Sequence, residues 1–299
     1  MALLVVGSVA LDTVSTPRGQ LAEGLGGSAV YFSIASSLFT PVHLVGVVGK
    51  DFPEEHISTL ETRGVDVEGL YIAEGKTFRW HGRYDEDFGD PETISTELNV
   101  FADFSPKLPP KYRDLPFVFL GNIHPKLQLK VLEQMKSPKL VAADTMNFWI
   151  ERERNTLLQV LEQIDMLIIN ELEVRLLTGV RSVLAGAEKI HTMGPATIVV
   201  KQGAYGAFAM SDGEIFTIPA FPTTAVMDPT GAGDSFAGGM VGYIARQGNI
   251  TPHTLKMGIV YGSLVASFNV EGFSIKSLEK LDMETLNRRL EKFRKMTEF

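Results

Sequence analysis

The segment from Asp228 to Gly239 (Asp-Pro-Thr-Gly-Ala-Gly-Asp-Ser-Phe-Ala-Gly-Gly) holds the residues of this chain whose types and spacing best suit chemistry. Within it, Gly231, Ala232 and Gly233 form a turn with almost no side-chain bulk, so a ligand can approach the backbone closely. Apolar residues at helical spacing then predict a helix that begins at about Asp234 (Phe236, Met240 and Tyr243). The unpaired N–H groups and the dipole of a helix start make an anion site.

A carboxylate in the first turn of that helix, Asp234, would lie beside a bound phosphoryl group. A helix cap explains a single acidic residue. It does not require Gly-Ala-Gly before the acid or Gly238-Gly239 after it. Phosphoryl transfer needs positioning, charge stabilisation and a base that receives the hydroxyl proton. The segment therefore predicts a phosphotransferase, with Asp234 as the base.

The sequence matches none of three other functional motifs. Gly69 to Thr77 imitates a P-loop but has five residues between its glycines where four are needed, and it leads into a strand pattern. No Gly-x-Gly-x-x-Gly follows the first apolar run, which argues against a dinucleotide site. Gly233-Asp234-Ser235 is similar to a hydrolase nucleophile motif, but no Asp-x-x-His exists to complete a triad. A hydrolase is therefore the weaker alternative.

Short apolar runs alternate with amphipathic stretches of helix length, which indicates a parallel sheet covered on both faces. The expected strands are Leu3–Val9, His43–Val48, Phe117–Leu120, Leu140–Ala143, Met166–Ile169 and Thr197–Val200. The expected helices are Ser28–Leu38, Glu54–Arg63, Lys126–Met135 and Thr156–Gln163. Ligands of such sheets bind beyond the carboxyl ends of the strands. Polar residues follow four expected strands there (Asp12, Asp144, Asn170-Glu171 and Lys201).

Two regions interrupt this alternation. Lys76–Tyr84 alternates like a strand, and Thr93–Phe104 supplies another after the polar stretch Asp85–Pro91, which predicts a small antiparallel addition. In Ala207–Pro219, Asp212-Gly213 lies between two apolar runs and predicts a hairpin.

Composition excludes several other classes. A net charge of −8 disfavours general nucleic-acid binding, which needs a basic surface. Cysteine is absent, so disulfides, cysteine–zinc sites and thiol nucleophiles are excluded, and the six histidines form no His-x-x-x-His pair. The run Met1 to Val6 has no basic lead-in and is too short for a bilayer. We therefore expect no signal peptide, no membrane anchor and a cytoplasmic location.

Taken together, the motifs resemble the ribokinase-type (PfkB) carbohydrate kinase family over nearly the whole chain. Gly7 to Asp12 is similar to the family's Gly-x-x-x-x-Asp, whose aspartate grips substrate hydroxyls, and Gly26-Gly27 is similar to its double glycine. Asn170-Glu-Leu-Glu173 resembles its Asn-x-x-Glu motif. Lys201 to Gly206 is similar to its nucleotide-binding turn, and Asp228 to Asp234 to its signature. The motifs stand in the family's order and approximate spacing.

The resemblance implies a three-layer α/β/α fold with a central, mainly parallel sheet and a small β-sheet lid over the substrate. Residues 1–299 would form a single domain, with the lid at about 13–25 and 76–104. It also implies that the helix Leu255–Val270 borders the adenine, with Gly258 and Gly262 either permitting that approach or serving helix packing. A homodimer formed through the lid is expected on the same grounds.

For the site, the resemblance implies transfer of the γ-phosphate of ATP to a hydroxymethyl group of a sugar or nucleoside. Four residues would bind that substrate (Asp12, Gly26, Gly27 and Tyr31). Four would bind ATP (Asn170, Lys201, Gly203 and Gly206). Asp234 would be the base, the turn Gly231, Ala232 and Gly233 its anion hole, and Glu173 a water-mediated magnesium ligand. In some relatives the positions of Asp228 and Thr230 help hold a monovalent cation, so potassium is implied only where that site is kept.

The chain departs from the family where the substrate is expected. Many relatives have a polar residue at Ala10 and an asparagine at Tyr31. A free sugar loses water from many hydroxyls and needs polar partners, whereas a base gains from aromatic surface such as Tyr31 or Trp80. Each aromatic is more often explained by core or lid packing, so sugar and nucleoside both stay open. A non-catalytic sugar- or nucleoside-binding protein is the remaining alternative, although it would be expected to lose the base or the anion hole.

The first prediction concerns the base. Asp234→Asn removes the group that receives the hydroxyl proton, and turnover should fall about a hundredfold or more. Nucleotide affinity should change little, because the amides of the turn remain. Steady-state kinetics and nucleotide titration measure the two effects, and near wild-type turnover would refute the assignment.

Overall fold

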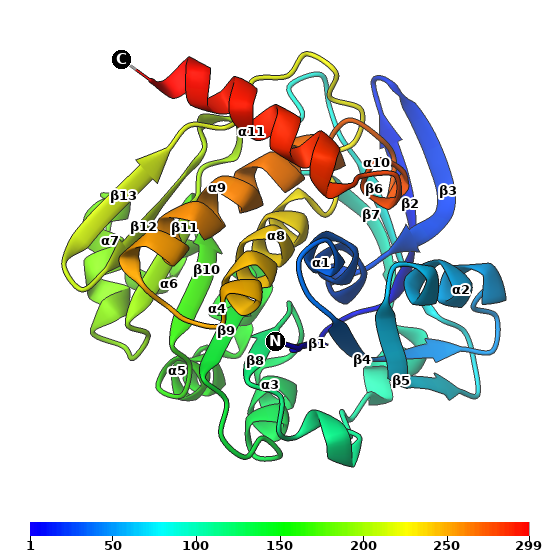
Figure 1. Ribbon diagram of the computed structural model, residues 1–299. Coiled ribbons are helices and arrows are strands. Elements are labelled where there is room, and N and C mark those ends of the chain that lie inside the picture. Colours follow the sequence, from blue (N-terminus) through cyan, green and yellow to red (C-terminus); the bar gives the residue numbers. More distant parts are fainter. Residues whose placement is uncertain (299) are drawn as a thin grey trace.

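A nine-stranded sheet runs through the centre of the computed structural model, which describes residues 1–298 (Figure 1). Its strand order is β13-β12-β11-β10-β9-β8-β1-β4-β5. Seven strands are parallel, and β12 and β13 add an antiparallel hairpin at one edge. The strands are β1 (Leu3–Val6), β4 (Val42–Gly49), β5 (Val65–Ala73), β8 (Phe117–Leu120), β9 (Leu140–Asp144), β10 (Met166–Asn170), β11 (Thr197–Lys201), β12 (Ala207–Ser211) and β13 (Glu214–Ile218).

Helices cover both faces of this sheet, and successive strand residues feed two cores (Figure 1). Leu3 and Val5 of β1 pack into one core, whereas Leu4 and Val6 pack into the other, as the two-residue period of a strand requires. The first core is covered by α1 (Ser28–Ser37), α2 (Glu54–Thr62), α8 (Ala232–Gln247), α9 (Pro252–Asn269), α10 (Lys276–Glu279) and α11 (Met283–Thr297). The second is covered by α3 (Pro125–Leu132), α4 (Asn147–Arg152), α5 (Arg154–Leu161), α6 (Glu171–Thr178) and α7 (Val183–His191). The predicted three-layer α/β/α class is confirmed.

A second sheet of four strands, in the order β3-β2-β6-β7, lies beside the first (Figure 1). The pairs β2–β3 and β6–β7 are antiparallel, and β2 and β6 join them in parallel. The strands are β2 (Ala10–Thr16), β3 (Gly19–Gly26), β6 (Phe78–Arg83) and β7 (Glu92–Glu97). Within the described residues, no helix has the length and apolar character to cross a membrane.

The predicted path of the first strand is wrong. β1 ends at Val6, and after three residues the chain enters β2, so Asp12 lies within the small sheet rather than at an end of the large one. The other three polar ends are where they were predicted. Asp144, Asn170 and Lys201 are the last residues of β9, β10 and β11, three neighbours in the large sheet.

Glycines set the distance between α8 and its neighbours. A Cβ atom on Gly238 would lie 2.8 Å from the Cβ of Ala35 in α1, and one on Gly262 of α9 would lie 2.6 Å from the carbonyl of Phe236. Such separations are too short for carbon atoms in contact, so only glycine lets the helices pack this closely. Gly238-Gly239 is therefore a packing feature and not part of the anion site. The same holds for Gly258 and Gly262, which face α8.

Gly238→Val tests this packing. The added side chain must displace α1, and we expect the free energy of unfolding to fall by about 1–3 kcal/mol in urea titration. Gly89→Val is the matched control, because a Cβ there meets no atom within 4 Å. It should change that free energy by no more than about 0.5 kcal/mol. Equal effects of the two variants would contradict the packing argument.

Candidate active site

The turn before α8 has the conformation that its small residues suggested. Gly231 has φ 73°, a left-handed conformation that favours glycine, and it is the N-cap of α8. A Cβ atom on Gly231 would overlap the ring of Tyr31, so the turn lies directly on that ring. No side chain caps the helix start. The N–H groups of the first turn are therefore available to an anion.

A lysine from the large sheet reaches this turn. Lys201 is the last residue of β11, and its Nζ would lie 2.9 Å from a Cβ atom on Gly233. The ammonium group thus lies beside the N–H groups that start α8. Asp234 is in the same helical turn, where burial raises the pKa of its carboxyl to about 6 even though Lys201 acts to lower it. A cation, backbone donors and a carboxylate with a pKa of about 6 therefore meet at one point.

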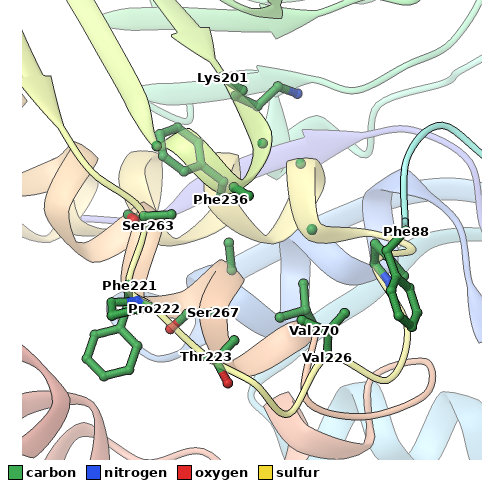
Figure 2. Close-up of a pocket in the computed structure, with 18 of the residues that line it drawn as sticks. Phe88, Lys201, Phe221, Pro222, Thr223, Val226, Phe236, Ser263, Ser267 and Val270 are labelled. Atoms are coloured by element: carbon green, nitrogen blue, oxygen red, sulfur yellow. The ribbon is translucent and has the colours of Figure 1, made fainter. Parts of the chain in front are cut away.

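A cavity of about 690 Å³ opens beside these groups (Figure 2). Lys201, Gly203 and Gly206 line it, and so do Ala232 and Gly233 of the turn. The cavity is large enough for a ligand of nucleotide size. Three of the four residues predicted for ATP are on its wall, whereas Asn170 is not among the lining residues.

Other parts of the cavity wall carried no usable sequence signal. One side is the irregular stretch between β13 and Asp228, including Phe221, Pro222, Thr223 and Val226. α9 lines the cavity through Ser263, Ala266, Ser267 and the adjoining Val270 rather than through its glycines, and its contact with an adenine stays a prediction.

The loop between β6 and β7 also reaches the cavity. Phe88, from this loop, lies beside Val226 and Val270 in Figure 2, and the neighbouring Asp87 also lines the cavity. Phe88 is one of few non-glycine residues with positive φ, at 51°. An apolar residue alone in the polar stretch 85–91 was the one available hint of this contact. Tyr84, just before this loop, accepts a hydrogen bond from the Thr230 hydroxyl (3.2 Å).

The Asn-x-x-Glu motif forms a capping box at the start of α6. The side chain of Asn170 accepts from the N–H of Glu173 (2.9 Å), and the Glu173 carboxylate accepts from the N–H of Asn170 (2.8 Å). Burial raises the pKa of Glu173, while Lys201 acts to lower it. The motif therefore fixes the helix start and holds a carboxylate near the lysine.

A buried carboxylate at the end of β9 has no protein partner for one of its oxygens. Asp144 is 5% exposed, and its Oδ1 forms no hydrogen bond. Burial and the charge of Asp234 raise its pKa well above the usual range, although Lys201 acts to lower it. Within residues 1–298 no group of three or more histidine or acidic side chains is placed to hold a metal by itself. A cation arriving with a bound anion would still find a free oxygen here.

Asp12 and the double glycine form the end of the small sheet next to the turn. Asp12 is buried, and a Cβ atom on Gly26 would overlap its carboxylate. Gly27 has φ 94°, caps α1, and donates its N–H to Asp12. Burial together with the charges of Asp228 and Asp234 raises the pKa of Asp12 to about 7.

Tyr31 lies between the same groups. Its ring supports Gly231 and is 1% exposed, so its face is covered; its hydroxyl is also buried and has no hydrogen-bond partner. The negative charges of Asp12, Asp228 and Asp234 add to burial in raising the pKa of that hydroxyl. If Tyr31 meets a substrate, it does so through its hydroxyl rather than by stacking.

Sequence comparison then decides the family. The model of the "pfkB family carbohydrate kinase" matches residues 3–277. The chain belongs to the PfkB family. It is 29% identical over 250 residues to the cytidine kinase of Thermococcus kodakarensis, covering 82% of this chain and 88% of the relative.

Solved structures show the same fold. The nucleoside kinase of Burkholderia thailandensis in complex with ADP-inosine has a TM-score of 0.82 at 16% identity, covering 97% of this chain and 95% of that one. A putative ribokinase II from E. coli in complex with ATP and Mg²⁺ has a TM-score of 0.80 at 19% identity, with 97% and 99% covered.

As a PfkB sugar or nucleoside kinase, this chain is a phosphotransferase that acts on an alcohol group. The hydrolase alternative is thereby excluded. The sequence motifs of this chain lie close together in the fold. The small sheet contributes Asp12, the large sheet contributes Lys201, and α8 contributes Asp234.

A pH profile tests this electrostatic arrangement. A base works only when deprotonated, so kcat at saturating acceptor should rise with pH through an apparent pKa near 6, well above the usual 3.8 of an aspartate. Lys201→Met removes the charge that lowers this pKa, and the rise should move to higher pH. Lys256→Met is the control, because Lys256 pairs with Glu214 on the edge of the sheet. An acid limb unmoved by Lys201→Met would refute the coupling.

Proposed function

We propose that this chain is an ATP-dependent kinase that transfers the γ-phosphate to the hydroxymethyl group of a nucleoside, with a free sugar as the alternative acceptor. One observation carries the proposal: Lys201, the start of α8 and Asp234 meet at the wall of a cavity of nucleotide size. The small sheet would serve as a lid, since it carries Asp12 and, through Tyr84, contacts the turn.

In this mechanism the nucleotide occupies the cavity, with its phosphates toward the turn. The N–H groups of Gly231 to Gly233 and the ammonium of Lys201 stabilise charge on the transferred phosphoryl group. The acceptor oxygen attacks the γ-phosphorus, its proton passes to the Asp234 carboxylate, and the bond from the γ-phosphorus to ADP breaks. A pKa near 6 leaves Asp234 mostly ionised at neutral pH yet basic enough to take this proton.

The donor set also fits magnesium. Magnesium prefers one or two carboxylates together with phosphate oxygens and waters. Asp144 has a buried oxygen without a partner, and Glu173 lies near the same lysine. These two residues would hold the ion, Glu173 through water. When bound, magnesium neutralises charge on the phosphates.

Acceptor recognition is assigned to Asp12. Its carboxylate can accept hydrogen bonds from two vicinal hydroxyls, as a furanose ring offers. Such bonds favour the ionised form, so acceptor binding should lower a pKa that burial has raised to about 7. Ala10, two residues before Asp12 on β2, offers no side-chain hydrogen bond, which favours a nucleoside, whose base needs fewer partners than the hydroxyls of a sugar. The names of similar kinases support the same choice.

A non-catalytic binding protein is the second candidate. The same fold and cavity would bind a nucleoside without turnover. The pKa of Asp234 and the uncapped turn argue against this, because neither is needed for binding alone.

An acceptor panel tests the proposal. With ATP and magnesium, we expect turnover on at least one of cytidine, adenosine, inosine and guanosine, and much lower kcat/KM on ribose and fructose. Turnover confined to sugars would refute the nucleoside assignment. Binding without turnover on any acceptor would favour the non-catalytic candidate.

Asp12→Asn tests the acceptor contact within the same assay. Losing charge-assisted hydrogen bonds should raise the acceptor KM about tenfold or more, while the KM for ATP changes little. Asp212→Asn, in the distant β12–β13 turn, is the control. A raised KM for ATP with an unchanged acceptor KM would move Asp12 to another role.

A further inference from the structure

A buried asparagine holds both ends of the turn that starts α8. Asn269 is the last residue of α9 and is fully buried. Its Nδ2 donates to the carbonyl of Thr230 (2.8 Å), and its Oδ1 accepts from the hydroxyl of Ser235 (3.1 Å). Thr230 precedes the turn and Ser235 follows the base. One amide therefore bridges the two ends of the segment that contains Gly231 to Asp234.

Both carboxylate oxygens of a nearby aspartate, Asp228, also accept hydrogen bonds from the backbone. Asp228 is 0% exposed; its Oδ1 accepts from the N–H of Thr230 (2.9 Å), and its Oδ2 accepts from the N–H of Ser274 (3.3 Å). The backbone of Asp228 is held as well, since its N–H donates to the carbonyl of Val270 (3.3 Å), the residue that follows α9. Burial raises the pKa of Asp228, and the N–H groups act to lower it.

These contacts bear on the monovalent cation that the sequence resemblance implied at Asp228 and Thr230. A cation would need the oxygens of both residues. Both carboxylate oxygens of Asp228 and the carbonyl oxygen of Thr230 already face the positive end of an N–H bond, from Thr230, Ser274 and Asn269 respectively. A cation placed among these three oxygens would be repelled by the N–H dipoles or would have to break buried hydrogen bonds. The residues present do not fit the ion.

We infer that Asn269 is the positioning residue of the catalytic turn, and that its amide takes the place of a monovalent cation, so the enzyme needs neither potassium nor sodium. The inference rests on the proposed kinase activity for one of its two readouts. The alternative is that Asn269 has a structural role alone, as the buried last residue of α9. In that case its loss would lower stability without changing how the enzyme responds to cations.

The wild-type protein gives the first test. After desalting, kcat is measured on its best acceptor in KCl, NaCl and choline chloride at equal ionic strength, and Tm is measured in the same three salts. We expect kcat to agree within about twofold and Tm not to differ, because no site is available to fill. Stimulation by potassium of tenfold or more, or a Tm that rises specifically with potassium, would overturn the inference. The Tm measurement decides even if no acceptor is found, so it is separate from the proposed function.

Asn269→Asp gives the second test. The carboxylate has the shape of the amide but cannot donate when ionised, so it faces the Thr230 carbonyl with like charge. We expect kcat in choline chloride to fall tenfold or more with a smaller change in the acceptor KM, because the turn is displaced. Potassium should recover part of kcat and raise Tm, since the new charge can bind it.

Asn249→Asp is the matched control, because it adds the same charge on the exposed loop after α8. It should show no potassium response. Wild-type kcat for Asn269→Asp in choline chloride would contradict a positioning role. If that variant does not fold, the wild-type measurements still decide whether a cation is required.

Discussion

The structure depends on holding several carboxylates close together where water is largely excluded. Asp12, Asp144, Asp228 and Asp234 come from separate elements, and for each of them burial raises the pKa. Removing such charges from water costs several kcal/mol per ion unless partners compensate. The compensation comes from Lys201 and from N–H groups at turns and helix starts. A carboxylate that stays basic near neutrality is what proton transfer from an alcohol requires.

Each of the two sheets contributes charged residues to this cluster. Parallel strands bring Asp144 and Lys201 to one edge of the large sheet, and α8 directs its free N–H groups to the same point. The small sheet brings Asp12, which is paired in register with Trp80. A side-chain hydrogen bond links the small sheet to the turn before α8, because Tyr84, which follows β6, accepts from the Thr230 hydroxyl. Movement of the small sheet would therefore act on the catalytic turn as well as on the acceptor.

The sequence predicted the strands and the turn that depend on local residue patterns. It did not predict the features that depend on contacts between distant residues. Alternating apolar runs located six strands of the large sheet, and the small residues at 231–233 located the anion turn. β5 was missed, because only one residue of this edge strand is buried and the strand contains a glycine. Placing Asp12 on the large sheet was wrong, since the chain changes sheets within three residues and no pattern marks the change. The buried bridge of Asn269 joins residues 39 positions apart, which one sequence cannot reveal.

The buried carboxylates also set stability against function. Burial raises the pKa of Asp12 from 3.8 to about 7, so the folded protein holds this proton more tightly than the unfolded chain does. Asp12 therefore contributes most to stability in acid, and this contribution is lost as the pH rises from about 4 to about 7. Asp234, the proposed base, loses its proton over the upper part of this pH range. A neutral side chain at Asp12 or Asp144 would avoid this loss, so the burial that keeps these carboxylates basic also makes the fold less stable at neutral pH.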